Sequence, residues 1–316
     1  MISKTKGPAL KRSPLAVLIL TVMMDLIGFG IIIPILPLYA KNFGASGFEV
    51  GLLMGIFSLM QLVFLPFWGR LSDRIGRRPV LLISIAGNAV SLLICALASD
   101  YWTLFVARLF AGVCSSNISV ANAYIADSTE LEHRAKGMGK IGAARGIGFV
   151  LGPALGGGLA EFGTSIPFYG ATLLALLNLA SAYFFLEESL PARLEGEHAG
   201  KSRFELLKIV RSLKNLRALI ALGAFQTLAF SMLEMSFVLF TENRLELSAQ
   251  EAAPVAGYLF LYLGVVIAVV QGGLIGRLTH LFGEQTLVSL GLLLVGVGMY
   301  LLTLTPVGNF AALLGF

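Results

Sequence analysis

The feature that most constrains this chain is a succession of apolar stretches separated by short polar segments. The hydrocarbon core of a bilayer is about 30 Å thick, and an α-helix needs about 20 apolar residues to cross it. We therefore predict transmembrane helices near residues 15–40, 48–69, 80–99, 101–126, 139–160, 166–186, 217–241, 253–275 and 286–304. A further apolar run begins at Gly308 and stops with the chain at Phe316.

The composition excludes a soluble domain. Hydrophobic residues make up 57% of the chain and charged residues only 13%, whereas soluble domains carry about 25% charged residues. A soluble protein of this composition would expose more apolar surface than water tolerates. We predict an all-α polytopic membrane protein. The first apolar run is too long for a signal peptide and shows no small-residue cleavage site, so it predicts a first transmembrane helix.

Lysine and arginine residues between the predicted helices indicate the orientation of the chain. Cytoplasmic loops of membrane proteins carry an excess of these residues. With the N-terminus in the cytoplasm, the basic loops all fall on the cytoplasmic side, and only Lys41 and Arg244 lie opposite. We therefore expect a cytoplasmic N-terminus. The net charge of +5 is a topology signal, and we expect no nucleic acid partner.

The longest polar stretch, residues 187–216, divides the sequence into two parts. It contains Pro191, Gly196 and Gly200 among many charged residues, which is typical of a linker. Residues 1–186 predict a complete bundle of six transmembrane helices. Residues 217–316 predict a partial second bundle, with three helices and the start of a fourth.

A short repeat indicates that the two parts are related. The segment that begins at Gly69 reads Gly-Arg-Leu and is followed by Gly76, and the same pattern begins at Gly276 and is followed by Gly283. Each copy ends a predicted helix on the cytoplasmic side. Parallel repeats of this kind are typical of transporters built from two similar bundles.

The first copy of the repeat lies in a loop with a dense pattern of glycines and charges. We expect Gly69 and Gly76 to allow a close approach of helices and a tight reversal. Asp73 is placed to pair with a neighbouring arginine or to face a helix N-terminus. A generic basic loop would serve topology without this arrangement. The residues of this candidate motif are Gly69, Asp73, Arg74, Gly76, Arg77 and Arg78.

The fifth predicted helix carries a second pattern of small residues. Glycines four residues apart form a groove for a neighbouring helix, and a proline frees a backbone carbonyl and kinks the helix. As a bare physical pattern, this is also compatible with tight packing alone. The residues are Gly139, Gly148, Gly152, Pro153, Gly156 and Gly157.

Four ionisable residues lie inside predicted helices: Asp25, Arg108, Arg145 and Glu234. A charge that faces lipid costs about 2.5–3.5 kcal/mol on insertion scales, so these side chains should face the interior or a cavity. Asp25 lies near mid-membrane and is a candidate proton carrier, with a structural hydrogen bond or ion pair as the alternative. Glu234 is a candidate for a second protonation site or a contact to a cationic substrate. Arg145, near the cytoplasmic end, is expected to snorkel.

Two polar residues complete the candidate cavity. The sequence does not support a metal site, a cofactor site or an enzyme. Asn117 and Gln226 are candidates for cavity lining, although interhelical hydrogen bonding is the commoner use of such residues. The three histidines fall in cytoplasmic segments, so we expect no metal site and no cofactor. No GxxxxGK[ST] loop is present, which argues against transport driven by the chain's own ATP hydrolysis. We do not expect an enzyme.

Together these motifs resemble the major facilitator superfamily of secondary transporters. The loop at residues 69–78 is similar to the family's signature, and the glycine pattern at 139–157 is similar to its antiporter signature. Asp25 with Gly28, Gly30 and Pro34, and the Arg108 segment, resemble the tetracycline-efflux and multidrug branch. The resemblance implies a major facilitator fold with a complete N-terminal and a partial C-terminal bundle.

The resemblance also implies a function and a setting. We expect proton-coupled efflux of hydrophobic, drug-like compounds by alternating access, with the Asp73 loop as a cytoplasmic gate and Arg108 beside the path of the proton. The expected partners are a small hydrophobic substrate, protons and the lipid bilayer of the cell's inner membrane, and the expected state is a monomer. A metabolite, sugar or organic-acid transporter of the same fold is an alternative. Because the chain stops inside an apolar run, a non-transporting fragment of a longer transporter is another.

Overall fold

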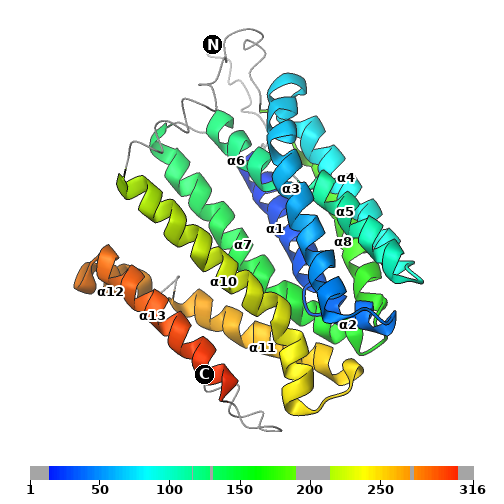
Figure 1. Cartoon of the computed structure of the whole chain (residues 1–316). Coiled ribbons are helices and arrows are strands. Elements are labelled where there is room, and N and C mark those ends of the chain that lie inside the picture. The colour runs from blue at the N-terminus through cyan, green and yellow to red at the C-terminus, as the bar shows by residue number, and fades with distance from the viewer. Residues whose placement is uncertain (1–13, 116, 129–130, 190–213, 271–273, 305–316) are drawn as a thin grey trace, which may run out of the picture. The chain divides into compact units, whose positions relative to one another are not determined.

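The computed structural model describes residues 14–115, 117–128, 131–189, 214–270 and 274–304, and its regular elements there are all helices (Figure 1). Within these residues, seven helical segments are long and apolar enough to cross a bilayer. The prediction of an all-α membrane protein is confirmed. The N-terminal tail, residues 190–213 of the predicted linker and the last apolar run lie outside the described residues.

The first predicted span consists of two helices, not one. α1 is Pro14–Ile32 and α2 is Leu36–Asn42, with a turn between them. Pro34 lies in this turn and disfavours helical geometry at the residue before it. Pro37 lies in the first turn of α2, where its missing N–H costs no hydrogen bond. The continuous helix expected over 15–40 therefore ends at Ile32 because of the two prolines.

The next three predicted spans form four helices. The fourth span, predicted over 101–126, is interrupted after Cys114. An aspartate caps the first of its two helices, because Asp100 accepts a hydrogen bond from the backbone N–H of Thr103 at 2.9 Å. The helices are α3 (Gly47–Ile75), α4 (Arg77–Ala96), α5 (Tyr101–Cys114) and α6 (Asn117–Ser128).

The remaining helices follow the predicted spans more closely, with shifted ends. A capping box starts α11, in which Ser248 and Glu251 satisfy each other's backbone N–H groups. The helices are α7 (Leu131–Ala160), α8 (Ile166–Phe185), α10 (Lys214–Leu245), α11 (Ala249–Val269), α12 (Ile275–Phe282) and α13 (Glu284–Thr303).

The chain folds into two compact units. The first comprises residues 1–29, 52–149 and 168–191, and the second comprises residues 30–51, 150–167 and 192–316. The core of the first unit is apolar and joins α1, α3, α4, α6, α7 and α8. Its largest fully buried members include Leu18, Leu81, Ile85, Tyr124 and Ile125. The division into bundles at residues 187–216 stays a prediction from sequence.

The internal repeat has a structural counterpart at the two helix junctions. Gly76 separates α3 from α4 with φ = +103°, and Gly283 separates α12 from α13 with φ = +76°. Residues with a side chain rarely adopt this conformation, so both copies need glycine at the same place. The spacing found in the sequence therefore marks one local geometry, used twice.

Candidate functional site

The loop after α3 reverses at Gly76 and starts α4 at once. A Cβ atom at this position would also collide with the carboxylate of Glu188. The predicted tight reversal is therefore confirmed at Gly76. At Gly69 the expected close helix approach is not found, because a Cβ there would meet no described atom within 4 Å.

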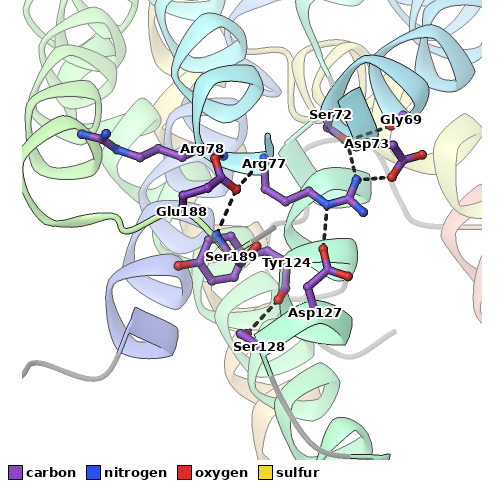
Figure 2. Close-up of polar contacts among 10 residues, drawn as sticks. All are labelled: Gly69, Ser72, Asp73, Arg77, Arg78, Tyr124, Asp127, Ser128, Glu188 and Ser189. Carbon is purple, nitrogen blue, oxygen red and sulfur yellow. Dashed lines mark hydrogen bonds and ion pairs between the residues drawn. The ribbon is translucent and has the colours of Figure 1, made fainter. Parts of the chain in front are cut away.

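The side chain of Arg77 lies between helices α3, α4 and α6 (Figure 2). Its Nη1 is 2.6 Å from Oδ1 of Asp73, and its Nε donates to Oδ2 of Asp127 at 2.8 Å. Nη1 also donates to the hydroxyl of Ser72 at 2.7 Å. Only 9% of the Arg77 side chain is exposed. We call Ser72, Asp73, Arg77 and Asp127 the Arg77 cluster.

Ser72 has no exposed surface and both of its hydrogen-bonding functions are used. Its hydroxyl accepts from Arg77 and donates to the carbonyl of Gly69 at 2.8 Å. The guanidinium is thus held from one side by α3 and from the other by Asp127 near the end of α6. Charge-assisted hydrogen bonds of this kind fix the guanidinium in direction as well as in distance.

A carboxylate distant in the sequence caps the start of α4. Oε1 of Glu188 accepts from the backbone N–H of Arg77 at 2.8 Å, and Oε2 accepts from that of Arg78 at 3.1 Å. Gly76, the N-cap residue, offers no side chain for this purpose. A negative charge at a helix N-terminus satisfies free N–H groups and opposes the positive end of the helix dipole. Glu188 therefore holds in place the backbone of Arg77, the central residue of the Arg77 cluster.

The end of α8 is tied to the same place by two further contacts. Arg78 donates from Nη2 to the carbonyl of Tyr183 at 2.6 Å, and its guanidinium lies 5.7 Å from the centre of the Tyr183 ring. The hydroxyl of Tyr124 in α6 donates to the carbonyl of Glu187 at 2.8 Å. These contacts connect the start of α4 and helix α6 to the end of α8 and the residues that follow it.

We expect Glu188→Ala to lower stability without removing any member of the Arg77 cluster. Loss of a helix-capping carboxylate costs about 1 kcal/mol. The unfolding temperature of the purified protein in detergent should fall, while Glu187→Ala should leave it unchanged. Glu187 is a matched control because its backbone carbonyl, and not its side chain, is the group in contact. Equal unfolding temperatures for the two variants would contradict the capping role.

Arg74 of the predicted motif is separate from the cluster. It is exposed and lines a hollow of about 220 Å³ together with Phe67, Arg70 and Leu71. Among the described residues, no ion pair involves Arg74. Of the six motif residues chosen from the sequence, Asp73 and Arg77 therefore pair in the cluster, whereas Arg74 lies outside it.

Asp25 lies in α1 and contacts α4. Its Oδ1 accepts a hydrogen bond from Nδ2 of Asn88 at 3.2 Å. One turn earlier, the carbonyl of Thr21 accepts from Nδ2 of the fully buried Asn178 in α8 at 3.0 Å. Two asparagines from neighbouring helices thus hold the α1 segment that carries Asp25.

Arg108 in α5 is buried against an aromatic ring. It is 4% exposed, and its guanidinium lies 4.3 Å from the centre of the Phe57 ring in α3. The Phe57 ring is in turn 5.6 Å from that of Phe29 in α1. Among the described residues, no carboxylate lies within ion-pair distance of Arg108. The group beside this arginine is therefore a π-face, which attracts a cation.

Three candidate cavity residues cannot be placed by their side chains. Asn117 lies in α6, and Gln226 and Glu234 lie in α10. Their side chains, and that of Arg145 in α7, fall outside the described residues. Their roles therefore stay predictions from the sequence.

The glycine pattern of α7 contacts two different helices. A Cβ at Gly148 would lie 2.7 Å from the Cβ of Leu26 in α1. At Gly156 it would collide with the backbone of Ile31, also in α1. At Gly157 it would lie 3.1 Å from the carbonyl oxygen of Ala253 in α11. These positions therefore form the predicted groove for neighbouring helices.

The other members of this motif differ in their surroundings. Pro153 and Gly152 are buried, and a Cβ at Gly257 of α11 would lie 2.6 Å from the carbonyl oxygen of Pro153. Gly139, by contrast, is exposed, and a Cβ there would meet no described atom within 4 Å. Close packing thus explains the later part of the motif and not its first glycine.

A comparison with family models shows which protein family has these features. The model described as Major Facilitator Superfamily matches residues 18–316. The chain belongs to this superfamily. The match covers all the described helices except the start of α1, and it includes both glycine motifs and the Arg77 cluster. The chain is a multi-pass membrane transporter, and its fold class is as predicted.

Known relatives agree with the family. The chain is 32% identical over 273 residues to the class B tetracycline resistance protein of Escherichia coli, covering 85% of this chain and 67% of that protein. It is 30% identical over 283 residues to multidrug resistance protein 2 of Bacillus subtilis (strain 168), covering 88% and 69%. The solved structure of the human organic anion transporter MFSD10 is similar, with a TM-score of 0.63 and 27% identity, and the match covers 84% of this chain and 72% of that chain.

Three residues that the structure brings to the candidate gate were given no role in it from the sequence. Ser72 lies inside the motif but was not assigned a role. Asp127 and Glu188 lie 50 and 111 residues beyond Arg77, at the ends of predicted spans on the cytoplasmic side. An acidic residue at a cytoplasmic helix end, beside a strongly basic loop, is the signal that would have identified both.

Proposed function

We propose that this transporter exports hydrophobic, drug-like compounds in exchange for protons, by alternating access across the inner membrane of the cell. The observation that supports the substrate class most directly is the likeness to tetracycline and multidrug resistance proteins over most of the chain. The glycine pattern of α7, which resembles the antiporter signature, supports exchange over symport. In this proposal the N-terminus is cytoplasmic and the transporter works as a monomer.

In the proposed mechanism the Arg77 cluster is a cytoplasmic gate. Its ion pairs hold the ends of α3, α4 and α6 as one rigid group. A rigid group at a helix end can open and close as a unit against the second bundle, whereas a loose loop cannot transmit the movement. The exposed Asp73 carboxylate is the part of the cluster that faces outward, with 59% of its side chain exposed.

Asp25 is the proposed proton carrier. An acidic side chain within a membrane span is expensive unless it serves a function or is paired, and Asn88 offers a neutral hydrogen-bond donor. This hydrogen bond keeps the carboxyl in place. In the proposal, the Asp25 carboxyl binds a proton and releases it during the cycle.

We expect Asp25→Asn to abolish exchange driven by a proton gradient while leaving substrate binding in place. Membrane vesicles with an imposed pH gradient would be used, and proton release on addition of a hydrophobic dye would be measured at matched expression. Asp100→Asn is the control, because Asp100 is an acidic residue that caps α5 outside the span. Proton release by the Asp25→Asn protein at the parental rate would rule out this carrier.

One observation favours a second candidate, the export of organic anions. Arg108 is a buried cation that has no carboxylate partner among the described residues, and a buried charge requires compensation. An anionic substrate would supply it, and the related MFSD10 is described as an organic anion transporter. Export of an anionic dye in preference to a cationic one, lost in Arg108→Gln, would favour this candidate.

A further inference from the structure

An ion pair joins the ends of α2 and α10, both within the second compact unit. Nζ of Lys41 lies 2.7 Å from Oε2 of Glu242. The exposed fractions of the two side chains are 39% and 16%. The pair links residues 201 positions apart in the sequence, one in the predicted first bundle and one in the predicted second bundle.

The position of Glu242 within α10 is unfavourable for a carboxylate. It lies in the last turn of α10, where the negative end of the helix dipole disfavours a carboxylate. Thr241 and Val238 on the same turn have no exposed surface, so the helix end is firmly packed. Lys41, in the last turn of α2, is the group that compensates the Glu242 charge.

The position of Lys41 in the membrane is also informative. In the predicted orientation, Lys41 and Arg244 are the only basic residues on the side opposite to the cytoplasm. Both are engaged near the end of α10, because Arg244 donates to the carbonyl of Thr303 at 3.0 Å. Arg244 joins two helices of the predicted second bundle, whereas Lys41 joins the two predicted bundles.

We propose that the Lys41–Glu242 ion pair is a releasable latch on the side of the membrane that the predicted orientation places away from the cytoplasm. The proposal rests on the proposed alternating access. The latch is made when the transporter is closed on that side and breaks when it opens there. A partly exposed ion pair contributes little to stability, which suits a contact that breaks in every cycle. The Arg77 cluster, by contrast, is centred on an arginine side chain that is only 9% exposed and is expected to persist.

The first test exchanges the two charges. Lys41→Gln and Glu242→Gln should each slow export roughly two- to fivefold, as the loss of one exposed ion pair predicts. The charge-reversed single variants should be slower still, and Lys41→Glu combined with Glu242→Lys should return most of the rate. Arg244→Gln is the matched control, since it removes a charge from the same helix turn without touching the latch. Failure of the double variant to recover at equal expression would contradict the pairing.

The second test separates a latch from a permanent brace. Cysteines at positions 41 and 242 would be joined by a short reducible bis-methanethiosulfonate reagent, with the parent chain as control because Cys95 and Cys114 are buried. Bridging should stop export, and a reductant should restore it. Unchanged export by the bridged protein would overturn the proposal.

The yield of bridging provides a readout that does not require export. It should fall when a pH gradient and a hydrophobic dye are applied, because the two helix ends then separate during part of the cycle. A yield that is the same with and without them would identify a permanent brace. If the parent chain does not export the dye but the bridging yield still falls when the pH gradient and the dye are applied, the result contradicts the proposed substrate and not the latch.

Discussion

Arg77→Gln is expected to abolish transport and to destabilise the folded protein. The substitution leaves Asp73 and Asp127 without their shared cation in a site where the arginine side chain is only 9% exposed. Removing one partner of a buried ion pair costs about 3–5 kcal/mol, and the exposure of Asp73 places this case at the lower end. Export of a fluorescent dye and the unfolding temperature in detergent would both be measured.

Arg74→Gln is the matched control for this variant. It removes the same charge from the same motif at an exposed position, so export and unfolding temperature should stay close to those of the parent. If lower stability alone explains the loss of export in Arg77→Gln, adding Asp127→Asn should restore the unfolding temperature and export together. The gate proposal predicts recovered stability without recovered export. Asp73→Asn that exports at the parental rate, at normal expression, would also contradict the gate.

The second large effect is expected at Gly156. A methyl group there would collide with the backbone of Ile31 in α1, which cannot move aside as a side chain could. Overpacking of this kind costs about 1–3 kcal/mol. Gly156→Ala should therefore lower the unfolding temperature and reduce export, and Gly156→Leu should prevent accumulation in the membrane.

Gly139→Ala tests whether the packing, and not the motif as such, is responsible. Gly139 belongs to the same motif and the same helix, but a Cβ atom there would meet no described atom within 4 Å. Alanine favours a helix over glycine by about 1 kcal/mol, so this variant should be as stable as the parent or slightly more so. A similar loss in both variants would show that close contact at Gly156 is not the cause.

The helices were predictable from the sequence because bilayer thickness sets their length. The positions of the main breaks were less predictable, although their causes are local. One helix is predicted over residues 15–40, although Pro34 and Pro37 lie in this run. An apolar run fixes the number of residues in the membrane and does not say where the helix inside it ends.

The candidate gate was predictable only in its local part. Asp73 at the end of α3 and Arg77 at the start of α4 are only four residues apart, so their pairing across the Gly76 reversal is a local contact. Asp127 and Glu188 reach the same place through the packing of α6 and α8 against α4, and spacing contains no information on such contacts. The ring beside Arg108 was missed for the same reason.

The measurement that tests the central proposal most directly uses inside-out membrane vesicles that contain this 316-residue chain and have an acidified interior. A fluorescent hydrophobic dye is added outside, and its accumulation and the interior pH are followed together, with and without a proton uncoupler. Proton-coupled export predicts that the dye accumulates, that protons leave as it enters, and that the uncoupler stops both. Accumulation at the same rate after the gradient has collapsed, or without proton release, would contradict the proposal.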